Sequence, residues 1–257
     1  MTSERHALEA WLETPPGEYL LAWEQAHIDR AVADLFGVHA LQIGLPELDA
    51  LRANRMQHRW CASDRDLVEQ PDGAAVVNVL CEFDVLPFAD QSLDLVILPH
   101  SLEMATDAHQ CLREVERVLR PEGRVVVIGF NPASLWGLRQ RLGWCWRRLG
   151  GSGALFLPRE GEFIAHRRLR DWMRLLGLEV EAGRFGCYRP ALFSPRWLAR
   201  FAWMEASGDR WWPVLGAVYL LTAVKRVKGM RLVGLVRRGH KPVGAAAAVV
   251  TQRQGPL

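Results

Sequence analysis

The chain has 257 residues, a formal net charge of +3 and 49% hydrophobic residues, a composition that suits one α/β domain of ordinary size. No apolar stretch reaches the roughly 20 residues that span a bilayer, and the N-terminus resembles no secretory signal. The five scattered cysteines form no C-x-x-C pair, which argues against a metal site or a disulfide framework and favours a cytoplasmic location.

The small net charge conceals an uneven distribution. Residues 1–130 carry 10 basic and 22 acidic side chains, whereas residues 131–257 carry 22 basic and 7 acidic ones. Eight of the eleven tryptophans also follow residue 130. The second half is therefore the expected place for substrate or membrane-surface contact. The alternative, given equal weight, is that its basic residues only form an ordinary solvated surface.

The first half begins with two predicted helices and continues with three predicted strands. Apolar residues at helical spacing predict helices over 3–13 and 18–36, which together form an N-terminal cap over residues 1–36. The predicted strands cover 39–43, 59–62 and 75–80.

A βαβ unit follows at the centre of the chain. Residues 95–98 and 125–128 are continuous apolar runs, which are typical of strands in the middle of a parallel sheet. Between them Thr106 or Asp107 can cap a helix with one apolar stripe, and Pro121 ends it before the next strand.

Two motifs of this unit carry a family resemblance. Leu86–Val96 reads LPFADQSLDLV, and Arg113–Gly123 reads REVERVLRPEG. Both resemble signatures of class I S-adenosylmethionine-dependent methyltransferases of the type-11 branch. The resemblance implies a Rossmann-like α/β fold with a mostly parallel seven-stranded sheet, helices on both faces and an antiparallel C-terminal hairpin, over residues 37–228.

The same resemblance implies a function. S-adenosyl-L-methionine would be the cofactor, and the methyl acceptor a small-molecule or lipid-like compound. The alternative is a binding protein of the same fold that has lost catalysis. No nucleic-acid recognition motif is present.

In the family, an acid and several glycines follow the first strand and hold the cofactor. Here Gln42 stands at the acidic position and Gly44 at the first glycine, while Pro46 and Leu48 replace later glycines. Proline removes a backbone N–H, so this turn cannot make every contact of a glycine-rich one.

Further cofactor contacts are expected at the next two strand ends. Asp64, with Asp66 as the second choice, stands where an acid binds the ribose hydroxyls. In the family the loop before the LPF motif carries an acid for the adenine amino group, so the resemblance implies Glu82 in this role and Phe83 beside the ring, with Asp84 as the alternative acid.

The fourth strand ends at Pro99 and His100, which are expected to face the sulfonium and the acceptor. His100 has a suitable pKa for a general base, although lining the cofactor is the favoured interpretation. Tyr19 of the cap is expected to line the same cleft.

Residues 133–165 form the expected substrate lid. Four arginines and two tryptophans lie along 138–149, and Trp136 and Trp144 are the predicted substrate contacts. Such a basic amphipathic helix suits weak contact with a membrane surface, or else packing into the domain. Beyond it we predict helices over 166–176 and 195–205, strands over 178–182 and 216–227, and a disordered basic tail over 229–257.

Overall fold

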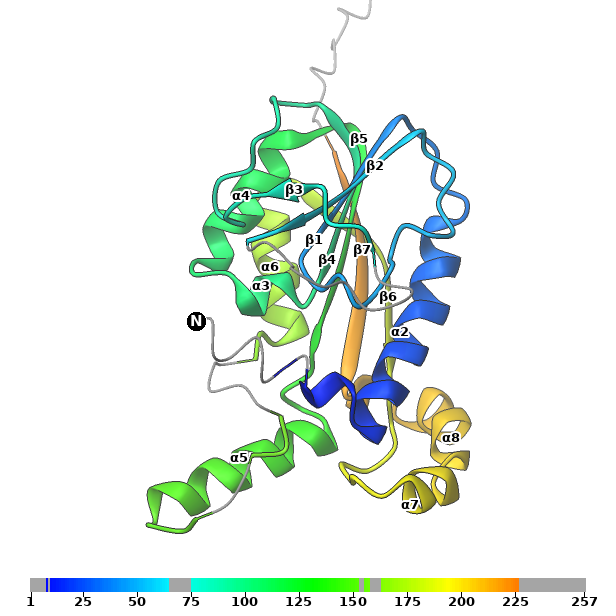
Figure 1. Ribbon diagram of the computed structural model, residues 1–257, viewed down its shortest axis with the longest axis vertical. Coiled ribbons are helices and arrows are strands. Elements are labelled where there is room, and N and C mark those ends of the chain that lie inside the picture. Colours follow the sequence, from blue (N-terminus) through cyan, green and yellow to red (C-terminus); the bar gives the residue numbers. More distant parts are fainter. Residues whose placement is uncertain (1–7, 9, 65–74, 153–154, 158–162, 227–257) are drawn as a thin grey trace, which may run out of the picture. The chain divides into compact units, whose positions relative to one another are not determined.

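The computed structural model describes residue 8 and residues 10–64, 75–152, 155–157 and 163–226. Its centre is a seven-stranded sheet of order β3-β2-β1-β4-β5-β7-β6 (Figure 1). The strands are β1 (His39–Ile43), β2 (His58–Ser63), β3 (Val79–Leu80), β4 (Leu93–Pro99), β5 (Leu119–Phe130), β6 (Leu178–Gly186) and β7 (Val218–Lys225). The strands pair in parallel except around β7, which is antiparallel to both β5 and β6. The predicted fold and its closing hairpin are confirmed.

Helices cover both faces of the sheet. They are α2 (Pro15–Val32), α3 (Ser101–Met104), α4 (Ala108–Val118), α5 (Leu135–Arg148), α6 (His166–Leu175), α7 (Pro195–Arg200), α8 (Trp203–Trp211) and the short 3-10 helix η1 (Pro213–Leu215). In Figure 1, α2 lies on one side of the sheet while α3, α4 and α6 lie on the other. Each face buries its own hydrophobic cluster, because the central strands are apolar on both sides.

Residues 44–57, which join β1 to β2, contain turns and no helix. This segment places Leu45 and Leu48 in the cluster that α2 covers. Gln25 of α2 donates to the Asp49 carbonyl oxygen at 2.9 Å, and Asp29 accepts hydrogen bonds from the Arg52 guanidinium. The N-terminal helix therefore packs where a helix between the first two strands would otherwise cover the sheet.

Several predicted boundaries shift in the structure. β3 has only two residues, whereas we predicted a strand over 75–80. β5 begins at Leu119 and includes Pro121, which we predicted to lie between the helix and the strand, and its register against β4 shifts between Leu93 and Leu95. The predicted helix over 195–205 is two helices, α7 and α8, and β6 continues to Gly186 because β7 pairs with it along that length. The predicted tail over 229–257 and Asp66 lie outside the described residues.

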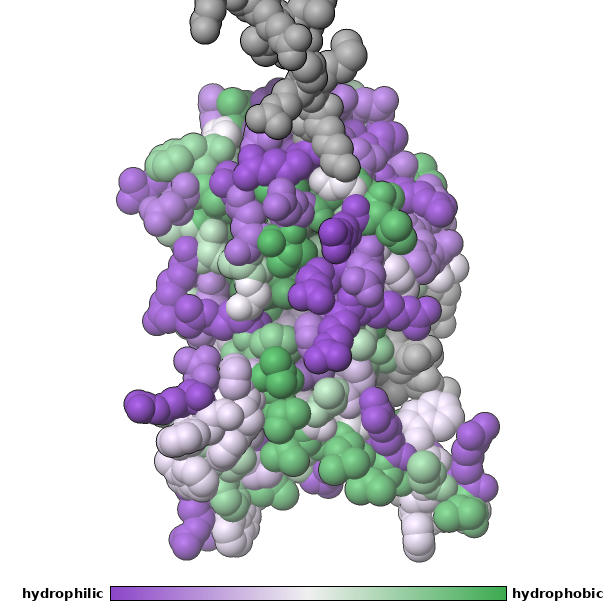
Figure 2. All heavy atoms as spheres, turned by 180° about the vertical axis from the view of Figure 1, so that it is seen from behind, coloured by the Kyte–Doolittle hydropathy of each residue, from purple (hydrophilic) through white to green (hydrophobic). Residues whose placement is uncertain are grey.

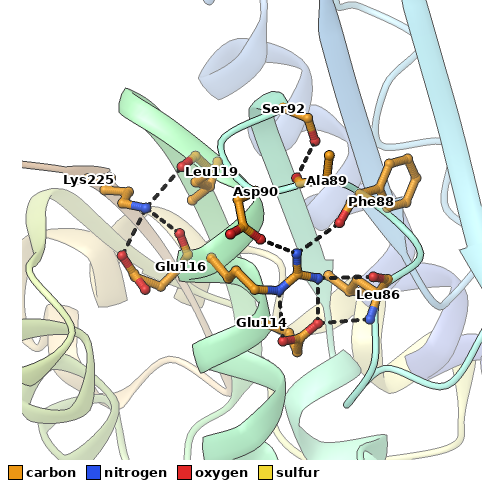
Figure 3. A network of polar contacts seen from close by, with 10 residues as sticks. Leu86, Phe88, Ala89, Asp90, Ser92, Glu114, Glu116, Leu119 and Lys225 are labelled. Atoms are coloured by element: carbon orange, nitrogen blue, oxygen red, sulfur yellow. Dashed lines mark hydrogen bonds and ion pairs between the residues drawn. The ribbon is translucent and has the colours of Figure 1, made fainter.

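The family motifs form a network that we call the signature clamp: Leu86, Phe88, Asp90, Glu114 and Arg117 (Figure 3). The Arg117 guanidinium donates to the carbonyl oxygens of Leu86 at 3.0 Å and Phe88 at 2.9 Å. It also pairs with Glu114 at 2.8 Å and with Asp90 at 2.6 Å. Glu114 in turn accepts the Leu86 N–H at 3.0 Å. The clamp fixes the loop before β4 to α4.

A second motif residue, Asp94, joins β4 to the start of β1. Its carboxylate accepts the N–H groups of Val38 at 2.8 Å and His39 at 2.9 Å, and it pairs with Arg120 at 3.0 Å. Burial alone would raise the pKa of Asp94, but these donors hold it below the ordinary value. Asp94 of the motif thus stabilises the sheet.

Candidate functional site

The carboxyl ends of β1, β2 and β3 form one edge of the sheet. The Gly44 N–H donates to Ala62 O, and the Cys81 N–H donates to Ser63 O, both at 2.8 Å. These bonds continue the ladders beyond the strands, so Gly44, Asp64 and Glu82 follow neighbouring strand ends. Ligands of open α/β sheets bind at such an edge.

Gln42 braces the turn after β1. Its side-chain NH₂ donates to the carbonyl oxygens of Leu45 at 3.0 Å and Leu48 at 2.7 Å, and its side-chain oxygen accepts the Ala50 N–H at 2.9 Å. The side chain is fully buried. Gln42 was predicted to bind the cofactor, but its polar atoms bind its own loop instead. An ionised carboxylate at this position would face carbonyl oxygens and repel them. This explains why a glutamine, whose amide can donate, stands here in place of an acid.

Gly44 adopts a conformation that other residues rarely take. Its φ is +74°, and an added Cβ would lie 3.2 Å from the Phe83 ring and 3.3 Å from the Ser101 hydroxyl oxygen. The next residue, Leu45, also has a positive φ of 45°. A glycine is required where backbone, ring and hydroxyl approach this closely.

The predicted acids at the neighbouring strand ends differ in their exposure to solvent. Asp64 and Glu82 are exposed, whereas Phe83 between the loop and the core is buried. Asp84 is half-buried, and burial raises the pKa of its carboxyl although the Asp107 backbone N–H lowers it. Glu82 and Asp64 therefore remain the proposed contacts to adenine and ribose, with Phe83 behind them.

His100 lies at the end of β4 after the buried Pro99, in the left-handed region with a φ of 54°. Its Nε2 is 2.7 Å from Glu24 Oε1, and its Nδ1 is 3.2 Å from Glu103 Oε2. Only 1% of the residue is exposed. Burial alone would lower the pKa of His100, but the two carboxylates raise it to about 9. The side chain is an imidazolium near neutral pH.

This arrangement disfavours the general-base interpretation of His100. Both ring nitrogens already donate, and a protonated ring cannot accept a proton from an acceptor. Glu103 also accepts the Phe130 N–H at 3.0 Å, so this buried ion cluster of Glu24, His100 and Glu103 connects α2, β4 and β5. It holds the N-terminal helix over the carboxyl edge.

Sequence reasoning missed Glu24 and Glu103. A signal for Glu24 was present, because it lies four residues after Leu20 and four before Ile28, on the buried stripe of α2. A charged residue on such a stripe indicates a buried partner. One carboxylate oxygen of Glu24 has no hydrogen-bond partner among the described residues.

The three predicted substrate contacts occupy different environments. The Tyr19 hydroxyl donates to Glu205, and burial raises the pKa of Tyr19. Trp136 is 1% exposed and donates to the Arg189 carbonyl oxygen at 2.8 Å, so it packs in the core and cannot meet a substrate in this conformation. Trp144 is 40% exposed and stays a proposed contact.

Trp136 belongs to a cluster of aromatic rings beneath the lid helix α5. Ring centroids of neighbouring members lie 5.3 to 6.4 Å apart, in edge-to-face arrangements. The cluster contains Trp11, Phe130, Trp136 and Phe156. The first turn of α5 therefore packs into the domain, which was one of the two interpretations of the lid.

A groove of about 590 Å³ lies between α5 and the start of α6. Aromatic and cationic side chains line it together, namely Trp144, Phe163, Arg141 and Arg168, with Pro132 just beyond the end of β5. Because β5 runs parallel to β4, this groove opens at the carboxyl edge. Among the described residues, no cluster of metal-binding side chains occurs.

Comparisons with known proteins place this geometry in a family. Residues 55–127 match the family model described as a methyltransferase domain. This match and the fold support a class I S-adenosylmethionine-dependent methyltransferase. Its cofactor is accordingly S-adenosyl-L-methionine, and it is an enzyme of the methyltransferase class.

Three matches illustrate the relationship. The methyltransferase is 29% identical to the uncharacterized protein YafS of Escherichia coli over 240 residues, which cover 92% of this chain and 88% of that protein. It is 40% identical over 65 residues to a ubiquinone/menaquinone biosynthesis C-methyltransferase, UbiE of Hahella chejuensis, covering 25% of this chain and 26% of that one.

The third match concerns the fold. A chain from the complex between the Haloferax volcanii Trm112 methyltransferase activator and a methyltransferase superposes with a TM-score of 0.56 at 17% identity. The match covers 88% of this chain and 98% of that chain.

The residues of this methyltransferase fit a nucleoside at the ends of β2 and β3. Two exposed carboxylates there can accept hydrogen bonds from ribose hydroxyls and from an exocyclic amine. At Gly44 the Phe83 ring and the Ser101 hydroxyl already occupy the space that a Cβ would take. The turn differs from a glycine-rich one, since Gln42 pulls its carbonyl groups inward and Pro46 is buried.

Proposed function

We propose that this methyltransferase methylates a small, lipid-like acceptor that binds in the groove between α5 and α6. The observation that carries the proposal is the lining of the groove, where Trp144 and Phe163 offer apolar rings and Arg141 and Arg168 offer cations. Such a lining suits an apolar molecule with a ring and an anionic or strongly polar group. UbiE, to which part of this chain is similar, is a ubiquinone/menaquinone biosynthesis C-methyltransferase, which supports an acceptor of this kind.

The chain's own residues would chiefly bind and orient. S-adenosylmethionine supplies an electrophilic methyl group on a positively charged sulfur, so the reaction is an in-line displacement. Asp64 and Glu82 would hold the nucleoside at the strand ends, and the buried ion cluster would keep α2 closed over the edge.

The charge of His100 bears on the acceptor. Because this imidazolium donates from both nitrogens, it does not remove the acceptor's proton. An acceptor whose nucleophilic atom ionises readily, such as an activated ring carbon or an acidic hydroxyl, therefore fits the site best.

Calorimetric titration with S-adenosylmethionine and S-adenosylhomocysteine tests the cofactor half of the proposal. We expect micromolar binding in the wild type and at least about tenfold weaker binding in Glu82→Ala, which loses a hydrogen bond to a charged group. Glu179→Ala removes an exposed carboxylate on β6 at the far side of the sheet and serves as the matched control. Binding with no methyl transfer to any quinol-like or lipid-like acceptor would favour the binding-protein alternative.

A further inference from the structure

The lid helix α5 exposes an apolar stripe on the face opposite its buried residues. Five large side chains recur at spacings of three or four residues, and each is between 48 and 83% exposed. They are Leu135, Leu138, Leu142, Trp146 and Leu149 at the end of the helix. At about 100° per residue, these positions share an arc about 80° wide. A solvated helix would carry polar side chains on that arc.

Arginines border the stripe without any acidic residue. Arg141 and Arg148 lie beside it on the exposed surface, and Leu135–Arg148 contains neither aspartate nor glutamate. On the other side Arg139 reaches back to the protein, donating to the Ala191 carbonyl oxygen and lying 5.0 Å from the Phe156 ring. The base of α5 is thereby anchored while its apolar stripe faces outward.

A second group of exposed rings lies on α7 and α8. Trp197, Trp203 and Trp211 are each more than half exposed, and exposed arginines flank them at Arg196 and Arg210. The two regions are tied together, because Trp136 at the start of α5 donates to Arg189 O and Asn131 donates to Val214 O at 2.8 Å.

The figures place both groups at one end of the structure. In Figure 1 α5, α7 and α8 lie at the end where β5 finishes, which is the carboxyl edge. Figure 2 shows pale and green side chains gathered at that lower end, with purple ones among them. The groove that contains Trp144 lies on the other face of α5, because Gly137 and Gln140, which are buried, line it.

We propose that this end of the protein docks on the surface of an anionic lipid bilayer, with the α5 stripe and the tryptophans of α7 and α8 inserted among the headgroups. On α5, leucine and tryptophan bordered by arginine, with no acidic residue in the helix, match the apolar boundary and the negative surface of such a bilayer. Patches of this kind on a soluble surface mark an interaction site. No helix among residues the structure describes could cross the bilayer, so the contact is superficial.

Docking in this orientation would place α5, whose other face lines the groove, against the bilayer, so a lipid-like acceptor would have a short path from the bilayer to the groove. This consequence rests on the proposed function, whereas the docking itself does not. A compound dissolved in the bilayer and a headgroup-bearing lipid are both compatible with the groove's aromatic and cationic lining.

Vesicle co-sedimentation of the full chain tests the docking. We expect binding to phosphatidylcholine vesicles that contain phosphatidylglycerol, weak binding to phosphatidylcholine alone, and release by high salt. The triple variant Leu138→Gln/Leu142→Gln/Trp146→Gln should bind at least about tenfold more weakly. The matched control, Phe36→Gln/Leu175→Gln, removes two exposed apolar side chains elsewhere and should bind like the wild type.

Bromine-labelled lipids locate the contact. They should quench the tryptophan fluorescence of the wild type, and Trp146→Phe should lose part of that quenching. Absence of wild-type binding, equal loss in both multiple variants, or a dimer that buries the stripe in sedimentation equilibrium would each overturn the proposal. Titration of the same proteins with S-adenosylhomocysteine separates failure of the docking proposal from failure of the proposed function. The triple variant should bind the cofactor product like the wild type even where it no longer binds vesicles.

Discussion

The signature clamp and the buried ion cluster are both built from ionic hydrogen bonds, yet they do different work in different surroundings. Arg117 of the clamp is 33% exposed and ties a loop to α4, using residues that carry the family resemblance. The cluster around His100 is almost completely buried and joins α2 to the carboxyl edge. The family motif thus builds the scaffold, while residues outside it shape the site.

The surroundings also predict different energetics. Water screens the clamp, so each of its pairs contributes modestly. The cluster lies in a medium where an unpaired charge is far more unfavourable, so removal of one member should have a larger effect.

Removal of Glu24 should therefore give the largest effect. Glu24→Ala leaves the His100 imidazolium with one partner and opens a cavity under α2, and we expect the free energy of unfolding to fall by roughly 3–5 kcal/mol. Urea denaturation measures it. Glu18→Ala, an exposed change on the same helix, should differ from the wild type by less than about 0.5 kcal/mol. Similar values for both variants would show that the cluster contributes nothing special.

The pH dependence of stability tests the charge on His100. Its pKa is about 9 in the folded state and about 6.5 in the unfolded state. The group's contribution is full below about pH 6.5 and is lost as the pH rises through about 9, so stability should fall by roughly 3 kcal/mol across that window. In His100→Asn the same window should be nearly flat. A parallel decline in both proteins would contradict a protonated His100.

Gln42→Glu tests the brace of the first turn by restoring the family's acid. A carboxylate would face the carbonyl oxygens that now accept the Gln42 amide, and we expect a loss of roughly 2–3 kcal/mol at pH 8. Relative to the wild type the loss should shrink as the pH falls, because protonation restores one donor. Stronger binding of S-adenosylhomocysteine by a fully stable variant would show that the turn prefers the acid.

Arg117→Ala should have the smallest effect of the four. Its hydrogen bonds to Leu86 O and Phe88 O are lost, but the loop is partly solvated, and we expect about 2 kcal/mol. Arg113→Ala on the same helix, which loses a single 3.5 Å bond to Gln110, should lose less than about 0.5 kcal/mol. A loss in Arg117→Ala as large as that in Glu24→Ala would reverse the comparison between the regions.

Much of the fold could be predicted from the sequence because its signals are local. The apolar runs of β4 and β5 and the Asp107 cap of α4 lie where periodicity and capping place them. Boundaries were less accessible: the extent of β6 depends on β7, about forty residues later in the chain.

The site was less predictable because its partners are distant in sequence. Glu24 and His100 are separated by 76 residues. Neither residue alone reveals that the Glu24 carboxylate stabilises the charged form of the His100 ring. Gln42 was predicted to bind the cofactor because it stands where the family has an acidic residue. The sequence shows that the acid is replaced, but it does not show that the Gln42 amide binds the carbonyl groups of its own loop. The sequence could not distinguish Trp136 from Trp144 as a substrate contact, because only the packing of α5 determines that Trp136 is buried and Trp144 is exposed.

A crystal structure with S-adenosylhomocysteine would test the central claim most directly, namely that the ends of β2 and β3 hold the nucleoside while the signature clamp only supports them. We predict adenine beside Glu82 and Phe83, ribose hydroxyls at Asp64, and no ligand contact with Glu114 or Arg117. A nucleoside bound elsewhere, or one that contacts the clamp, would contradict the account.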